Sequence, residues 1–197
     1  MGCPGYGNKI EEMEKEITLR SIAGYCTEET LWVLMEDLCN VAKADHCMMT
    51  PDSIVIDGNN FLVKEHEKPS VDFLAPEYNE EKRSTSACLV WSIGANVYYA
   101  SSGHVLFGGR GGGYQQKHPA APLPVLQKAH RGLTPVIQRC LRANPFDRIS
   151  LEELQEVAKS GLDECRRKGR TSVPAKTRDL EIKSTVDNNW PEEMIEI

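Results

Sequence analysis

Residues 46–57 read His46-Cys47-Met48-Met49-Thr50-Pro51-Asp52-Ser53-Ile54-Val55-Ile56-Asp57 and end in an apolar run. That run, Ser53–Ile56, is followed by a second one at Phe61–Lys64. Between the two runs lies Asp57-Gly58-Asn59-Asn60, whose residue types favour the backbone of a tight hairpin turn. The sequence therefore predicts a small two-stranded ribbon.

Helical patterns surround this ribbon. Ahead of it, apolar residues recur at helical spacing after Thr27, the expected N-cap, as Leu31, Leu34, Met35, Leu38 and Ala42. A second helix, over Ser84–Ala100, is apolar nearly all round and therefore belongs at the centre of the domain. Thr134-Pro135 begins a third helix, and the capping box Ser150-x-x-Glu153 begins a fourth that runs through Ser160. The glycine- and proline-rich segment 101–131 is predicted as surface loop, so the fold class is mainly α (α+β).

Five short motifs follow the ribbon in order: Glu65-His66-Glu67, Ala75-Pro76-Glu77, Trp91-Ser92-Ile93-Gly94, Gly103-His104-Val105-Leu106-Phe107 and Cys140-Leu141-x-x-Asn144-Pro145-x-x-Arg148-x-Ser150. With residues 46–57, this ordered set resembles the C-terminal lobe of protein kinases. The corresponding kinase motifs are H-R-D-L-x-x-x-N, D-F-G, A-P-E, D-x-W-S-x-G, G-x-x-P-F and C-L-x-x-[DN]-P-x-x-R-x-[ST]. The resemblance implies an isolated kinase-like C-terminal lobe over residues 27–160, with the small ribbon inside it.

The residues that perform kinase chemistry are replaced in this resemblance. Met48 stands at the catalytic aspartate, Thr50 at the lysine, Ser53 at the magnesium asparagine and Glu65 at the metal-binding aspartate. A methionine thioether cannot accept the proton of a substrate hydroxyl. We therefore expect that the chain is not an enzyme, with no catalytic residues and no bound cofactor or metal.

The segment before Thr27 is too short for the small lobe with which a kinase holds ATP. It contains Leu19–Gly24, and Thr27–Trp32 follows. These residues resemble the entry to the kinase non-catalytic C-lobe domain (KIND), a protein-binding module. The resemblance implies a pseudokinase that acts in protein–protein interaction, with a protein or peptide partner in the groove that the missing lobe leaves open. The expected partner surface comprises segment 101–131 with Tyr98, Tyr99 and Phe107.

Two other functions remain open. One is a degenerate pseudokinase that binds a nucleotide or receives a small lobe from another chain. The other is an enzyme of different chemistry that uses Glu65, His66 or Glu67, a trio that could also hold a divalent cation. The default interpretation of the trio is a solvated loop edge.

The resemblance also implies a structural ion pair. In the kinase family the glutamate of A-P-E pairs with the arginine of N-P-x-x-R, and these positions are Glu77 and Arg148 here. Removing one member of a buried pair costs about 3–5 kcal/mol. A chain that has lost the catalytic residues but kept this pair has the character of a scaffold.

Composition limits the classes of partner. The chain has 197 residues, 40% of them hydrophobic, which suits one compact domain, and its net charge of -6 argues against nucleic-acid binding. No apolar run approaches the roughly 20 residues of a membrane span. The seven cysteines include no C-x-x-C pair, which favours a reduced, cytoplasmic protein.

The two ends of the chain flank the lobe. Residues 1–26 form an N-terminal segment with room for a short helix over Ile10–Leu19. Residues 161–197 form a tail, because Arg166–Arg170 is basic and contains glycine and is not expected to continue the preceding helix. Trp190, within an acidic ending, either docks on a partner or folds back on the lobe.

Overall fold

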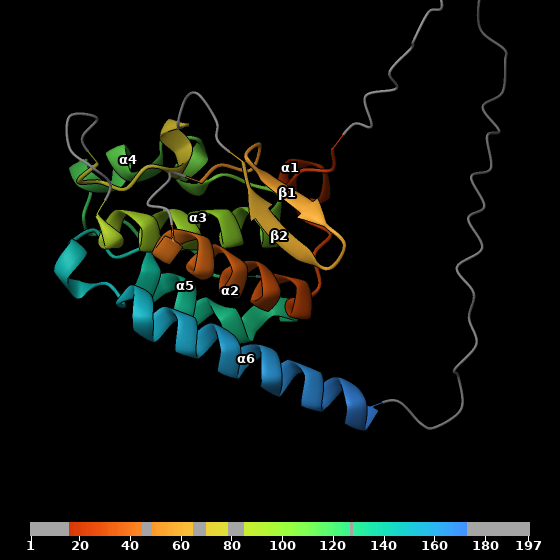
Figure 1. Ribbon diagram of the computed structural model, residues 1–197. Coiled ribbons are helices and arrows are strands. Elements are labelled where there is room, and N and C mark those ends of the chain that lie inside the picture. The colour runs from red at the N-terminus through yellow and green to blue at the C-terminus, as the bar shows by residue number, and fades with distance from the viewer. Residues whose placement is uncertain (1–15, 45–48, 65–69, 79–84, 127, 173–197) are drawn as a thin grey trace, which may run out of the picture.

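The computed structural model describes residues 16–44, 49–64, 70–78, 85–126 and 128–172 (Figure 1). The α-helices are α1 (Leu19–Ile22), α2 (Glu28–Ala44), α3 (Ser86–Ser102), α4 (Gly111–Lys117), α5 (Thr134–Cys140) and α6 (Leu151–Ser172). The strands are β1 (Ile54–Asp57) and β2 (Asn60–Val63), and short 3-10 helices lie at Val71–Phe73, Leu106–Gly108, Lys128–Leu133 and Pro145–Asp147. The described chain is therefore mainly helical, with one small antiparallel sheet, as the sequence predicts.

Helix α3 is the centre of the molecule. Figure 1 shows it between α4 and the ribbon on one side and α2 and α5 on the other, with α6 along the outer edge. Most of its residues are buried, including Trp91. The Trp91 Nε1 donates to Gln115 Oε1 at 3.0 Å, and Gln115 Nε2 donates to the carbonyl of Leu141 at 2.5 Å. One buried amide therefore joins α3, α4 and the end of α5.

Helix α2 begins where its sequence predicts. The backbone N–H of Thr30 donates to Thr27 Oγ1 at 3.2 Å, which satisfies one of the free donors at the helix start. The same helix positions the ribbon, because Asp37 Oδ2 accepts the backbone N–H of Phe61 at 2.8 Å. The ribbon pairs Ile54 with Val63 through Asp57 with Asn60, which confirms the predicted hairpin.

The segment predicted as surface loop, 101–131, contains helix α4, and this is a correction. A β-carbon on Gly111 would lie 2.2 Å from the carbonyl oxygen of Val71, and one on Gly112 would lie 2.4 Å from the carbonyl oxygen of Leu74. The glycines therefore allow α4 to pack directly on the backbone of residues 71–76. They are packing residues here, although a cluster of glycines usually indicates a flexible linker.

The last helix is also longer than predicted. Its start is confirmed, since the backbone N–H of Glu153 donates to Ser150 Oγ at 3.1 Å. It does not end at Ser160, however, but continues through Gly161 to Ser172. Its later turns carry an ion pair between Arg166 and Glu29 of α2 at 2.9 Å, so contacts with α2 accompany the helix beyond the glycine.

Candidate functional site

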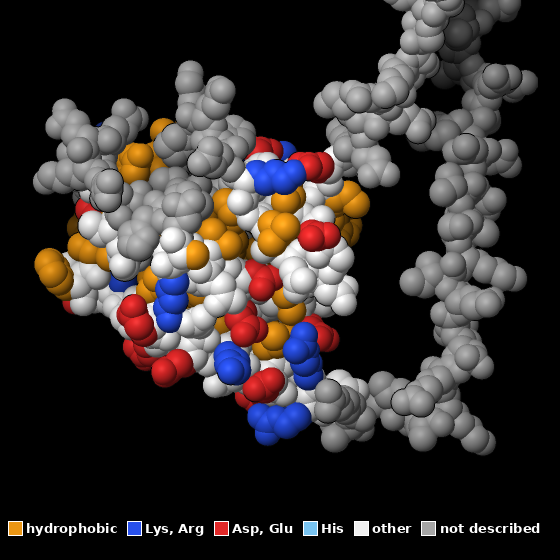
Figure 2. All heavy atoms as spheres, viewed as in Figure 1, with side chains coloured by type: hydrophobic (Ala, Val, Ile, Leu, Met, Phe, Trp, Pro, Cys, Tyr) orange, Lys and Arg blue, Asp and Glu red, His pale blue; other side chains and the backbone are white. Residues whose placement is uncertain are grey.

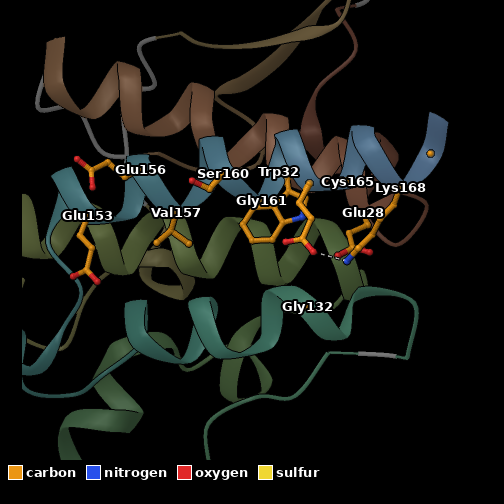
Figure 3. A pocket seen from close by; sticks show the side chains of 12 residues that line it. Glu28, Trp32, Gly132, Glu153, Glu156, Val157, Ser160, Gly161, Cys165 and Lys168 are labelled. Carbon is orange, nitrogen blue, oxygen red and sulfur yellow. Dashed lines mark ion pairs between the residues drawn. The ribbon is translucent and has the colours of Figure 1, made fainter. Parts of the chain in front are cut away.

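A groove of about 850 Å³ lies along α6, between that helix, the start of α2 and the turn before α5 (Figure 3). Its lining includes four carboxylates and a small apolar surface. The carboxylates are Glu28, Glu153, Glu156 and Glu164, and the apolar side chains are Trp32 and Val157. In Figure 3, Glu153 and Glu156 lie at one end, Trp32 lies in the middle, and Glu28 lies at the other end.

The groove follows from the spacing of residues on α6. Glu153, Val157, Gly161, Glu164 and Lys168 recur every three or four positions and so share one face of the helix. The adjoining face, one residue further along the helix, is apolar and buried, with Leu154, Ala158 and Leu162 in the core. One helix therefore contributes a side to the core and presents a charged face to the groove.

Trp32 and Gly161 form the floor. Trp32 is 6% exposed, and a β-carbon on Gly161 would lie 2.7 Å from two carbons of its indole ring. The helix backbone can approach the ring only because residue 161 has no side chain. This close approach explains why the glycine occurs within the helix and does not end it.

The electrostatic character of the groove is negative. Arg139 pairs with Glu153 at 2.6 Å and Lys168 pairs with Glu164 at 2.8 Å. Within the described ranges, Glu28 and Glu156 have no ion-pair partner. Figure 2 shows acidic side chains gathered over the lower part of the molecule, with basic ones near the end of α6.

The thiol of Cys165, which lines the groove, responds to this field. Partial burial raises its pKa, and the nearby negative charges of Glu28 and Glu29 raise it further. The pKa of Lys168 is also raised, chiefly by its hydrogen bond to Glu164 and in small part by Glu28. The Lys168 shift shows that the carboxylates beside it favour its charged form.

The groups that line the groove are suited to binding a basic ligand. Carboxylates accept charge-assisted hydrogen bonds from lysine and arginine, and the apolar floor can cover an aliphatic side chain. In the part of the chain that the structure describes, no group of three His, Cys, Asp or Glu side chains could hold a metal ion. Ser101 and His130 form a hydrogen bond of 2.7 Å, but Ser101 is buried and cannot meet a substrate.

Glu77 and Arg148 form the ion pair that the sequence predicts. Arg148 donates to both carboxylate oxygens, at 2.5 and 2.6 Å, and also to the backbone carbonyls of Ala87, Arg142 and Ala143. Burial alone would raise the pKa of Glu77, but hydrogen bonds and the charge of Arg148 outweigh it, so the pKa lies below its ordinary value. The pair joins the segment before α3 to the turn before α6.

The predicted partner surface does not form one exposed face. Tyr98 is half-buried, whereas Tyr99 is 8% exposed and packs edge-on against Phe73 with ring centroids 5.7 Å apart. Phe107 is half-buried against Tyr114, with centroids 5.5 Å apart. Tyr99 is therefore a core residue, which corrects its prediction as exposed, and Trp190 lies outside the described residues.

Two of the positions that the kinase resemblance assigns to catalysis lie within the described residues. Thr50 and Ser53 are buried, and their side chains bond within their own turn. Ser53 Oγ accepts the N–H of Thr50 at 2.9 Å and lies 3.0 Å from the Thr50 carbonyl, to which it donates. Met48, Glu65, His66 and Glu67 lie outside the described residues.

The sequence matches no protein-family model and no curated protein. In the described helices, no stretch has both the length and the apolar character needed to cross a membrane. Sequence reasoning missed the acidic groove because it ended the last helix at Ser160, ahead of Gly161, Glu164 and Lys168. The signal that could have revealed it is the recurrence of Glu153, Val157, Gly161 and Glu164 on one helical face.

Proposed function

We propose that this chain is a non-catalytic protein-interaction module whose acidic groove binds a basic segment of a partner protein. The observation that carries the proposal is the groove itself, in which Glu28, Glu153, Glu156 and Glu164 surround a floor made by Trp32. Binding pockets commonly combine an apolar lining with a few polar groups that fix the orientation of a ligand. Here those groups are carboxylates, so the complementary ligand carries lysine or arginine next to an apolar side chain.

The resemblance to a kinase C-terminal lobe without its small lobe supports the non-catalytic part of the proposal. The lobe assignment itself is also a proposal, and the Glu77–Arg148 pair is consistent with it. Thr50 and Ser53 use their hydroxyls within one buried turn, so neither is directed at a metal or a substrate. The described cysteines, Cys26, Cys39, Cys88, Cys140 and Cys165, are all free, which is consistent with a cytoplasmic protein.

Selection from a random peptide library tests the function and requires no identified partner. We expect the selected peptides to be enriched in lysine and arginine with at least one large apolar residue. Their affinity falls at least tenfold in the full chain carrying Glu28→Lys and Glu156→Lys, the two carboxylates without an ion pair among the described residues. It also falls as salt is added, because the pairs are partly exposed.

Glu152 supplies the matched control. It is exposed on α6 next to Glu153 but does not line the groove, so Glu152→Lys makes the charge change of one of these two substitutions outside the site. We expect the chain carrying Glu152→Lys to bind the selected peptides with an affinity within about twofold of that of the wild type. Selected peptides without basic residues, or equal weakening by the control, would contradict the proposed function.

A further inference from the structure

The groove opens towards the end of α6, where the described chain stops. Lys168 and Gly169 line it at that end, and Ser172 is the last residue of the helix. The residues that follow, 173–183, read Val-Pro-Ala-Lys-Thr-Arg-Asp-Leu-Glu-Ile-Lys. Pro174 has no backbone N–H and cannot extend the helical hydrogen bonds. The chain that leaves α6 therefore starts beside the groove.

The sequence of this segment has a period of two. Lys176, Arg178, Leu180 and Ile182 alternate with Thr177, Asp179, Glu181 and Lys183. In an extended chain, alternate side chains point to opposite faces. One face would then carry two basic and two aliphatic side chains, while both acidic side chains lie on the other face.

The order of that face matches the order of the groove. Read from the end of α6, the groove presents Lys168 with its ion-pair partner Glu164, together with Glu28, which has no ion pair among the described residues. The apolar floor of Trp32 and Val157 comes next (Figure 3). A segment that folds back along α6 presents its basic side chains first and its aliphatic side chains next. Charge therefore meets opposite charge, and apolar surface meets apolar surface, along the same direction.

The lengths also agree. From Glu153 to Lys168 the helix rises roughly 22 Å, at about 1.5 Å per residue. Residues 173–183 span roughly 33 Å when extended, at about 3.3 Å per residue. The segment can therefore reverse direction after α6 and still cover the groove.

We infer that residues 173–183 occupy the acidic groove in the isolated chain and that a basic partner binds by displacing them. This inference rests on the proposed function, because it assigns an internal competitor to the same site. A tethered ligand has an effective concentration of about 1 mM, so a segment with a Kd of about 100 µM weakens an external ligand about tenfold. A partner therefore has to bind the groove tightly enough to displace the tethered segment.

A fluorescent peptide with the sequence of residues 173–183 tests the inference by anisotropy on the full chain. The chain with Lys176→Glu and Arg178→Glu has a weakened internal competitor, and we expect it to bind the probe about tenfold more tightly than the wild type. Adding Glu28→Lys and Glu164→Lys to that chain removes probe binding. The matched control, Asp179→Asn with Glu181→Gln, alters the opposite face and keeps the affinity of the wild type.

Each outcome decides a separate point. Equal probe affinity in the wild type and in the Lys176→Glu, Arg178→Glu chain overturns the inference, as does binding that ignores the groove substitutions. If no form binds the probe while library-selected basic peptides bind the groove, the inference fails and the proposed function stands. If neither the probe nor any basic peptide binds, both fail.

Discussion

Gly161 of α6 lies against the indole ring of Trp32 in α2, so close that a β-carbon at position 161 would stand 2.7 Å from the ring. This contact brings the two helices together and forms the floor of the acidic groove. Glycine costs a helix interior about 1 kcal/mol relative to alanine, so local preference alone opposes it here. The tertiary contact outweighs that preference.

Gly161→Ala is therefore expected to lower the free energy of unfolding by about 1 kcal/mol. Overpacking costs about 1–3 kcal/mol and exceeds the gain in helix propensity. Gly169→Ala, on the same helix with nothing within 4 Å of its added β-carbon, is the control and gains up to about 1 kcal/mol. Urea unfolding of both variants measures the difference. Equal stabilisation by the two alanines would show that the ring does not restrict position 161.

Gly112→Ala tests whether α4 is packed rather than a linker. Its β-carbon would lie 2.4 Å from backbone atoms of Leu74 and Pro76, which cannot move aside as a flexible side chain can. We expect a loss of more than about 2 kcal/mol in the free energy of unfolding. Gly113→Ala, where the added β-carbon meets nothing within 4 Å, is expected to be neutral or slightly stabilising. A neutral Gly112→Ala would restore the linker interpretation.

These glycines mark the limit of prediction from the sequence. The ribbon, the start of α2 and the central position of α3 follow from local patterns, namely a turn sequence, a cap and a uniformly apolar helix. Gly112 and Gly161 look like breakers in the sequence because their role depends on residues distant along the chain. The sequence predicts a loop at α4 and too early an end for α6, because both helices depend on such contacts.

The residues of the candidate sites also differ in whether they could be predicted from the sequence. The pairing of Glu77 with Arg148 is implied by the resemblance of their two motifs to those of protein kinases, and the structure contains this pair. The acidic groove is not implied in this way, since Glu28 and Glu164 meet only after α2 and α6 pack together. Tyr99 is predicted at the surface, but its position on α3 directs it towards Phe73 in the core.

Glu77→Ala and Arg148→Ala are each expected to destabilise the fold, by about 3 kcal/mol or more. Arg148 without Glu77 is a buried charge, and loss of Arg148 also leaves three backbone carbonyls without their donor. The double variant is expected to lose less than the sum of the singles, because the two residues share one interaction. Chemical unfolding of the four forms gives the coupling. Additive effects would mean that the pair contributes nothing as a pair.

The same pair predicts a dependence of stability on pH. The pKa of Glu77 is lower in the folded state than its ordinary value of 4.5, so the unfolded state takes up a proton first as pH falls. The stabilisation is fully present above pH 4.5 and is lost as pH falls through the lower, folded value. Glu77→Gln removes this contribution and flattens the curve of stability against pH in that range. An unchanged slope in the variant would assign the acid sensitivity to other groups.

The chain is expected to transfer no phosphate and to gain no stability from ATP with magnesium or manganese. Met48 has no proton-accepting group, and the Thr50 and Ser53 hydroxyls bond within their own buried turn. A nucleotide at 100 times its Kd would add about 2.7 kcal/mol to the free energy of unfolding and raise Tm by several degrees. Thermal unfolding with ATP and each metal measures this, and a library-selected basic peptide serves as the positive control. A rise in Tm that needs both nucleotide and metal would favour the degenerate pseudokinase, and phosphate transfer that Met48→Ala abolishes would establish an enzyme.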